Sequence, residues 1–209
     1  MTAYNFGPGH PMAPQRLELT ARLAESLGLF DHQHVAVEAP TVATDVELFT
    51  VHSREYVEAV RRVSVDPSAP EEDRGLGTED DPAFAGMHEA SARLAGGSLL
   101  AAETILSGQA VRAVNFSGGM HHAARERASG FCVYNDVAMA IQRLLDGGGV
   151  QRVVSIDVDA HHGDGTQSIF WNDPPCHDHQ PARIGPHAFP RHGLCQRNRR
   201  TKRPGGDRG

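Results

Sequence analysis

Two short apolar segments in the middle of the chain each run into a pair of adjacent histidines. Residues 111–116 precede His121-His122, and residues 152–158 precede His161-His162. Between them, residues 137–145 carry apolar side chains at helical spacing and end at three consecutive glycines. A strand, a helix and a second strand in this order predict a βαβ unit with parallel strands. Ligands of such sheets bind beyond the carboxyl ends of the strands, so both histidine pairs are expected at one functional edge.

The segment after the second predicted strand is rich in carboxylates and imidazoles. Asp157, Asp159 and His161 share one face of an extended chain, because side chains alternate with period two. Asp159 and His161 are therefore candidate ligands of one metal ion. Aspartate oxygen and imidazole nitrogen suit Zn²⁺, and Fe²⁺ or Mn²⁺ less selectively. A catalytic zinc site has three protein ligands and a water, so a third ligand must come from elsewhere.

Each cluster also has a simpler interpretation. A single Asp-x-His at a strand end is more often a hydrogen-bonded pair, and two histidines after a glycine turn can form an exposed loop. Several polar residues at the end of an apolar strand are harder to explain as packing, because buried carboxylates are costly unless paired or coordinated. Beside the acidic segment, His121 and His122 become candidate proton-transfer groups, with Asp157 and Asp164 available to orient their rings.

Other helices are predicted upstream. Apolar residues at helical spacing predict a helix over residues 14–28, with Pro14 at its first position and Gly28 at its end. A second helix is expected through residues 57–61 and a long one over residues 88–106. The segment 66–82, rich in Pro, Asp, Glu and Gly, is predicted to be a surface loop.

Composition limits the class of protein. The chain has 209 residues and a net charge of −6, which suits one α/β domain. It contains no run of about 18 apolar residues and no secretory signal pattern, so no membrane partner is expected. The three cysteines, Cys132, Cys176 and Cys195, lack paired spacing. They favour a reducing, cytoplasmic location over a disulfide scaffold.

The end of the chain differs in composition from the rest. Residues 174–209 hold eight Lys and Arg against two Asp and Glu, whereas residues 1–173 hold twelve against twenty-four. Neither a helical nor a strand period is evident there. We therefore expect a disordered basic tail behind the domain portion at residues 1–173. A nucleic-acid-binding arm is the less favoured alternative.

Six ordered motifs resemble the histone deacetylase superfamily, and among its members most of all the bacterial acetoin-utilisation deacetylases. The matching segments are His10-Pro11-Met12 with Arg16, His52-Ser53 with Tyr56, Glu79-Asp80 with Pro82, Gly118 to His122, Ser129 to Asp136, and Asp157 to Gly165. The resemblance covers about residues 3–173. It implies an α/β fold with a doubly wound parallel sheet flanked by helices, as in arginases and deacetylases, and the βαβ unit above is consistent with that fold.

The resemblance also implies roles for the catalytic residues. Asp159 and His161 match metal ligands, for Zn²⁺ first of all. His121 and His122 match a tandem pair around a metal-bound water, in which His122 would be the general base. Asp157 would support His121, and Asp164 would support His122.

Substrate-binding residues are implied in the same way. Gly130 and Phe131 match a narrow tube that admits an acyl-lysine side chain, and Asp80 matches a carboxylate at its rim that grips the substrate backbone. Cys132 lies beside this tube. A small buried hydrophobic side chain explains it at least as well as a redox role.

Two elements of the family pattern are missing. A third metal-binding aspartate and a tyrosine that polarises the amide carbonyl should follow the segment 157–165. The aspartates after this segment, Asp173, Asp178 and Asp207, do not lie in a recognisable metal-ligand motif. The tyrosines of the chain, Tyr4, Tyr56 and Tyr134, all precede the segment. The family also usually has a strand before Tyr4.

A frameshift would explain the change near residue 173. Residues 177–187 can be encoded so that reading one base later gives an apolar strand followed by His-Glu-Ser, which is how the family continues. We therefore expect a truncated deacetylase domain with an out-of-frame tail.

Three functional hypotheses follow. The first is hydrolysis of an acetyl-lysine, or of an acetylpolyamine or other small acylated amine, by metal-activated water. The second is a non-catalytic remnant of such an enzyme. The third is a nucleic-acid binder acting through residues 174–209, which the acidic remainder of the chain makes the least favoured. The oligomeric state is not predicted.

Overall fold

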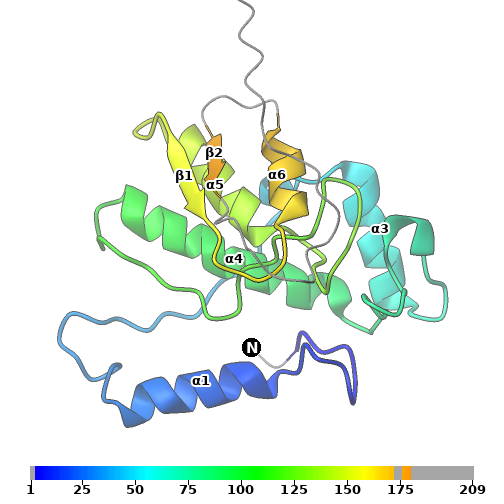
Figure 1. Cartoon of the computed structure of the whole chain (residues 1–209), viewed down its shortest axis with the longest axis horizontal. Coiled ribbons are helices and arrows are strands. Elements are labelled where there is room, and N and C mark those ends of the chain that lie inside the picture. Colours follow the sequence, from blue (N-terminus) through cyan, green and yellow to red (C-terminus); the bar gives the residue numbers. More distant parts are fainter. Residues whose placement is uncertain (1–2, 172–175, 180–209) are drawn as a thin grey trace, which may run out of the picture.

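A computed structural model describes residues 3–171 and 176–179 of the chain. Its elements in order are α1 (Gln15–Ser26), α2 (Asp45–Leu48), α3 (Arg54–Val65), η1 (Glu72–Arg74), α4 (Met87–Leu106), α5 (Asp136–Asp146), β1 (Val153–Ile156), α6 (Asp164–Phe170) and β2 (Cys176–His179). In Figure 1, α4 crosses the centre, with α1 below it, α3 at one end, and α5, α6 and the strands above. None of the described helices is long and apolar enough to cross a membrane.

The described sheet consists of one parallel pair. β1 pairs with β2 from Val153 opposite Cys176 to Ile156 opposite His179, and α6 lies between them in the chain. β2 falls within the segment 174–209, where we expected no strand. Four mostly polar residues are too few to show the side-chain alternation of a strand. β2 is defined instead by its backbone pairing with β1.

The predicted strand at residues 111–116 is wrong. This segment contains no regular element, and Val111 and Val114 are 88% and 77% exposed. A strand needs a hydrogen-bonded neighbour, and in the described residues β1 and β2 pair only with each other. The expected doubly wound sheet is therefore represented in the described part of the chain by a single parallel pair. β1 is also shorter than the predicted segment 152–158.

The predicted helices are present with small shifts at their ends. α1 begins after Pro14, which stands one position before the helix rather than at its first residue. α3 begins after Ser53, whose Oγ accepts the N–H of Tyr56 at 3.3 Å. α4 continues through its two central glycines. A Cβ at Gly96 would lie 1.9 Å from the carbonyl oxygen of Thr41, so glycine allows the segment before α2 to cross α4 closely.

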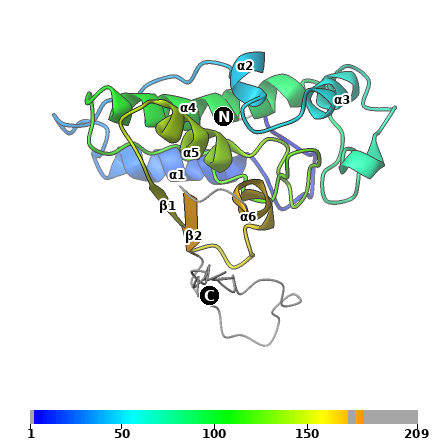
Figure 2. The ribbon, with the colours of Figure 1, turned by 90° about the horizontal axis from the view of Figure 1, so that it is seen from above.

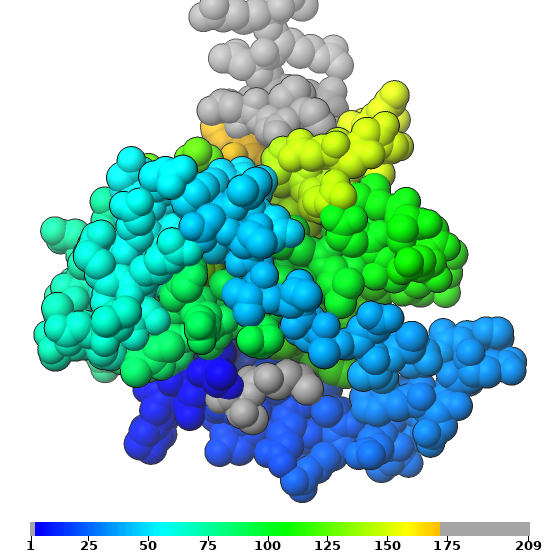
Figure 3. Space-filling view, turned by 180° about the vertical axis from the view of Figure 1, so that it is seen from behind, coloured from blue at the N-terminus to red at the C-terminus, as the bar shows by residue number. Residues whose placement is uncertain are grey.

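The core lies between α3, α4, α5 and the loops that precede α5. The loop 66–82 is not wholly at the surface as predicted, because Leu76 and Asp81 are buried. α1 extends alongside α4 in two views (Figures 1 and 2), with Leu19 and Leu23 exposed. The residues after α1 form an arm on the surface (Figure 3).

The prediction of an out-of-frame tail concerns residues 174–209. Apart from β2, these residues lie outside the described part of the chain.

Candidate active site

The His121-His122 pair lies on the loop between α4 and α5 and is held from the start of α5. The side chain of Asn135 is fully buried, and its Oδ1 caps α5 by accepting the N–H of Ala138 at 2.9 Å. Its Nδ2 donates to the carbonyl oxygen of Ala123 at 2.8 Å, directly after the histidine pair. The N–H of Thr166 in α6 donates to the carbonyl oxygen of His121 at 3.0 Å. The loop is therefore fixed to two helices.

Asp136 fixes the glycine turn that leads into the histidine pair. Its Oδ1 accepts the N–H of Gly119 at 3.1 Å and that of Met120 at 2.7 Å. Burial raises the pKa of Asp136, while the hydrogen bonds from Ser98, Met120 and Gly119 oppose that rise. A buried carboxyl group with several donors anchors the turn.

His121 is paired with Asp157. The Nδ1 atom of His121 lies 2.6 Å from Oδ2 of Asp157, and both side chains are largely shielded from solvent. The other carboxylate oxygen of Asp157 accepts the N–H of Asp159 at 2.9 Å. The carboxylate therefore orients one imidazole ring and also the loop after β1.

His122 is paired with Asp164, the first residue of α6. Its Nδ1 lies 2.7 Å from Oδ1 of Asp164, and this hydrogen bond raises the pKa of His122 against a smaller opposing effect of burial. Burial raises the pKa of Asp164, but its contacts with His122 and the N–H of Gly165 outweigh that effect and lower it. The rings of His121 and His122 are 4.2 Å apart between centroids.

Asp159 and His161 lie beside this pair. Nδ1 of His161 is 2.9 Å from Oδ1 of Asp159, and the N–H of His161 donates to the same oxygen at 2.7 Å. Hydrogen bonding from that N–H lowers the pKa of Asp159, against a smaller effect of burial. The His161 and His122 rings are 6.1 Å apart, so the two predicted clusters meet at one end of β1.

The donor set for a metal ion is only partly present. An aspartate oxygen and an imidazole nitrogen that converge are chemically suitable for zinc. Within residues 3–171 and 176–179, however, no group of three His, Cys, Asp or Glu residues is placed to hold an ion. Asp159 and His161 therefore fit such an ion as two ligands of an incomplete set.

The residues expected to bind substrate lie on two neighbouring loops. Phe131 has a positive φ of 69°, which is unusual for a residue other than glycine, and its carbonyl oxygen accepts the hydroxyl of Tyr4 at 2.8 Å. The His10 ring lies 4.6 Å from the Phe131 ring and its Nε2 is 3.2 Å from the carbonyl oxygen of Asp80. Asp80 itself is exposed.

Gly130 lies against the candidate general base. A Cβ at this position would come within 2.4 Å of Cδ2 of His122, and φ is 54°. Both facts require glycine here. The loop of Gly130 and Phe131 is thus in direct contact with the histidine pair.

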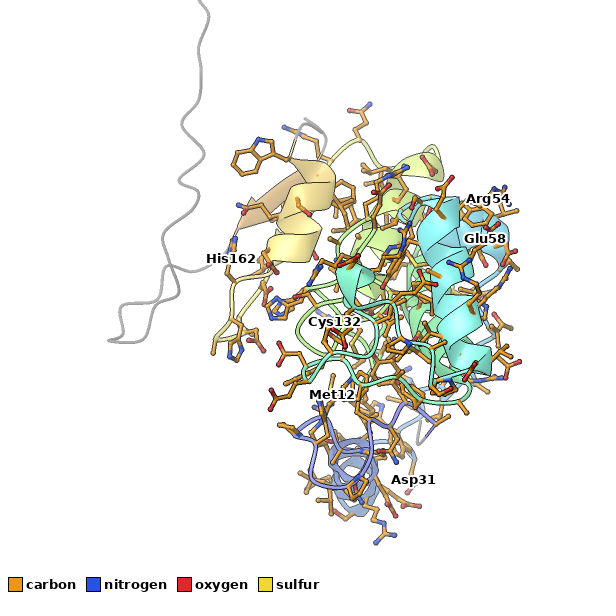
Figure 4. All side chains as sticks on the ribbon, turned by 90° about the vertical axis from the view of Figure 1, so that its right-hand side faces the viewer. Met12, Asp31, Arg54, Glu58, Cys132 and His162 are labelled. Atoms are coloured by element: carbon orange, nitrogen blue, oxygen red, sulfur yellow. The ribbon has the colours of Figure 1, made fainter. Side chains whose placement is uncertain are left out.

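Cys132 is buried beneath this loop. Its Sγ lies 3.2 Å from the carbonyl oxygen of Gly130, and burial raises the pKa of the thiol to about 12. Such a thiol is inert as a nucleophile. Figure 4 shows Cys132 in the interior and His162 at the edge, on the loop before α6.

Sequence patterns did not identify three residues near the site. Asn135 and Asp136 were recognised within a motif but given no role, although a polar residue before a helical stripe is a capping signal. Asp81 was not singled out, because nothing in a loop rich in acidic residues distinguishes a buried carboxylate from exposed ones.

Comparisons with known proteins find a matching domain and similar bacterial proteins. A model of the histone deacetylase domain matches residues 10–205, and so extends past residue 173, where we expected the resemblance to end. The acetoin utilization protein AcuC of Bacillus subtilis (strain 168) is 44% identical over 195 residues, covering 92% of this chain and 50% of that protein. AcuC of Staphylococcus xylosus is 43% identical over 173 residues, covering 81% of this chain and 44% of that protein.

The chain spans about half the length of these curated relatives. The domain match nevertheless covers most of its residues, and the six motifs lie inside the matched range or directly at its start. The chain belongs to the histone deacetylase family.

Proposed function

We propose that this chain carries the proton-transfer residues of a deacetylase active site. Such a site hydrolyses an N-acetylated amine to acetate and the free amine. The observation that carries the proposal is the pair of His–Asp contacts, His121 with Asp157 and His122 with Asp164, whose rings are 4.2 Å apart. Two oriented imidazoles side by side are arranged for acid–base chemistry.

His122 would act as the general base. Its Nδ1 faces Asp164, so Nε2 is the nitrogen that would take a proton from the attacking water and return it to the leaving amine. His121, held in the same manner by Asp157, would be the second proton-transfer group beside the metal-bound water. Both roles follow the resemblance and the contacts described above.

Asp159 and His161 would hold the metal, Zn²⁺ in the first place, with Fe²⁺ or Mn²⁺ as alternatives. When bound, such an ion supplies a Lewis acid and lowers the pKa of a bound water. Since the described residues supply two donors, a third ligand would have to complete the site.

Gly130 and Phe131 would form the wall of the substrate tube, and Asp80 would bind the substrate backbone at its rim. The contact between Gly130 and His122 supports this placement, because an acyl group beside Phe131 would then reach the histidine pair. The substrate would be an acetyl-lysine in a protein. An acetylpolyamine or another small acylated amine would use the same chemistry.

Several broader assignments are also proposals. The parallel pair β1–β2 with α6 between its strands is consistent with part of a doubly wound sheet flanked by helices. The scattered cysteines favour the cytoplasm. The boundary near residue 173 and the out-of-frame origin of residues 174–209 are tested by the nucleotide sequence on both sides of the reading frame.

A non-catalytic remnant is the second candidate, favoured by the two-donor set at Asp159 and His161. The purified 209-residue chain should be loaded with Zn²⁺, dialysed, and assayed with an acetyl-lysine peptide and with acetylspermidine. About one bound ion per chain together with release of acetate from either substrate supports the deacetylase. An ion bound without any turnover would leave the remnant as the better description.

A further inference from the structure

Two consecutive side chains at the start of α5 hold the loop on either side of the histidine pair, and the proposed reaction uses neither of them. Asp136 accepts the N–H groups of Gly119 and Met120, which come just before the pair. Asn135 donates to the carbonyl oxygen of Ala123, which comes directly after it. The histidine pair is therefore attached to one end of α5 from both sides.

The carboxyl group of Asp136 is surrounded by hydrogen-bond donors. The residue is 1% exposed, and its Oδ1 lies 2.7 Å from the backbone nitrogen of Met120 and 3.1 Å from that of Gly119. The hydroxyl of Ser98 in α4 donates to Oδ2. Asp136 forms no ion pair with any cation of the described residues. Since a buried carboxyl group is costly without its hydrogen bonds, these donors fix where it lies.

The turn and this carboxyl group fit closely together. A Cβ at Gly118 would lie 2.4 Å from Oδ2 of Asp136 and 3.0 Å from Oγ of Ser98. Gly118 is not among the residues with a positive φ, so its backbone conformation does not require glycine. The close approach to Asp136 requires it instead.

Local hydrogen bonds shape the turn but do not attach it to α5. The N–H of Gly118 donates to the carbonyl oxygen of Asn115 at 3.3 Å, and the N–H of His121 donates to the carbonyl oxygen of Gly119 at 2.9 Å. Both bonds close within the loop itself. The side chain of Asn115 ties the start of the loop to α4. The hydrogen bonds to Asp136 are thus what attaches this turn to α5.

We propose that Asp136 is a positioning residue, which fixes the loop before the histidine pair and so keeps both imidazoles facing their aspartates. Because His121 directly follows Met120, a displacement of that backbone would change the 2.6 Å contact between His121 and Asp157 and the 4.2 Å spacing of the two rings. The consequence for catalysis rests on the proposed function, whereas the effect on the loop does not. Asparagine offers the same acceptor oxygen and can donate to the Ser98 hydroxyl, so it should replace Asp136, and alanine should not.

Amide hydrogen exchange of Met120 tests the positioning without reference to activity. In the full chain, Asp136→Ala should accelerate exchange of this amide by about tenfold or more, while the amides of α3 keep their rates. Asp136→Asn should stay within about threefold of the parent chain. Asp146→Ala is the matched control, because it removes an exposed carboxylate from the same helix. Equal Met120 exchange in Asp136→Ala and the parent would overturn the proposal, and so would an equal acceleration of the α3 amides.

Gly118→Ala provides a second variant should Asp136→Ala fail to fold. Its Cβ would push the turn away from the carboxyl group, so it should also accelerate Met120 exchange by about tenfold. Gly149→Ala is the control for this change, since a Cβ at Gly149 meets no atom within 4 Å. With Asp136→Ala unfolded, equal Met120 exchange in Gly118→Ala and Gly149→Ala would reject the proposal.

Kinetics separate this inference from the proposed function. Because the loop carries the proposed proton-transfer groups and not the substrate wall, Asp136→Ala should lower kcat by about 10–100-fold and change KM for an acetyl-lysine peptide by less than about threefold. Asp136→Asn should restore kcat. A parent chain without turnover would contradict the proposed function, while the exchange rates would still decide on Asp136. A rise in KM at constant kcat would contradict the role of Asp136 in positioning the histidine pair.

Discussion

Nδ1 of His122 lies 2.7 Å from Oδ1 of Asp164, although 42 residues separate the two in the sequence. This contact links the loop before α5 to the first residue of α6. Asp164→Asn keeps the shape of the side chain but removes the charge that holds the imidazole. Partners of this kind typically contribute about 10–100-fold to activity, so acetate release should fall by that factor.

Asp31→Asn is the control for this change, since Asp31 is an exposed carboxylate on the segment after α1 (Figure 4). It should leave the rate of acetate release unaltered. An Asp164→Asn enzyme as active as the Asp31→Asn enzyme would show that the contact has no catalytic role.

His52 should remain neutral in the folded protein well into the acidic range. It is 1% exposed, and its Nε2 accepts the N–H of Asn135 at 3.0 Å, which requires a lone pair on that nitrogen. Burial lowers the pKa of His52 to about 4. Because the unfolded chain binds this proton near pH 6.5, the free energy of unfolding should lose up to about 3 kcal/mol as pH falls from 6.5 to 4.

Imidazole resonances in a pH titration of the folded protein measure this pKa directly. The His52 ring signal should stay constant from pH 8 to about 5 and move only below that. A midpoint near 6.5 for this ring would be inconsistent with its buried hydrogen bond to Asn135.

Asp81 should make stability depend on pH in the opposite sense. Since its pKa is about 7 in the folded protein and 3.8 is its ordinary value, the folded state keeps a proton that the unfolded state has already released. The free energy of unfolding should therefore fall as pH rises from about 4 to 7, by up to about 4 kcal/mol. Asp81→Asn removes this loss.

Urea denaturation of the parent and of Asp81→Asn at two pH values checks the sign. At pH 8 the variant should be more stable by about 1–4 kcal/mol, and at pH 5 the difference should shrink by more than half. The same difference at both pH values would mean that the Asp81 carboxyl group does not titrate in this range.

Asn135→Ala should be strongly destabilising. The change removes the cap of α5 and leaves the carbonyl oxygen of Ala123 without a buried partner, while the Thr166 hydroxyl keeps only its 3.4 Å contact with the carbonyl oxygen of His121. Losing a cap costs about 1 kcal/mol and one unsatisfied buried carbonyl group about 1–3 kcal/mol, so a loss of roughly 2–4 kcal/mol is expected.

Thermal denaturation gives the measurement, with Asn5→Ala as the control. Asn5 makes one exposed hydrogen bond, to the N–H of Gly7, and its removal should cost less than about 1 kcal/mol. Similar losses in the two variants would argue against the role of Asn135 as the link between α5, α6 and the histidine loop.

Local patterns were sufficient for much of this structure. The apolar spacing and the glycine ends predicted α1, α4 and α5, because a helix makes its hydrogen bonds within its own segment. The convergence of His121-His122 with Asp157 and Asp159 was also predicted, although from two neighbouring parallel strands, of which the one at residues 111–116 is absent. The residue pairs that would work together were expected from the family resemblance.

Features that depend on distant neighbours could not be predicted. Residues 111–116 have the composition of a strand, but a strand forms only beside a partner, and none pairs with them in the described chain. Asp81 lies in a loop that is mostly polar, yet it is 1% exposed, and its pKa is affected by His122, 41 residues later in the chain. Neither fact is encoded in the local pattern of side chains.

The rate of acetate release from an acetyl-lysine peptide, compared between the zinc-loaded parent chain and His122→Ala, tests the central assignment most directly. The parent should release acetate above the uncatalysed rate, and His122→Ala should be slower by about 10²–10⁴-fold, the usual contribution of a general base. His32→Ala, a change to an exposed histidine outside the site, should match the parent. A His122→Ala protein as fast as the parent, or a parent with no activity above background, would contradict the account.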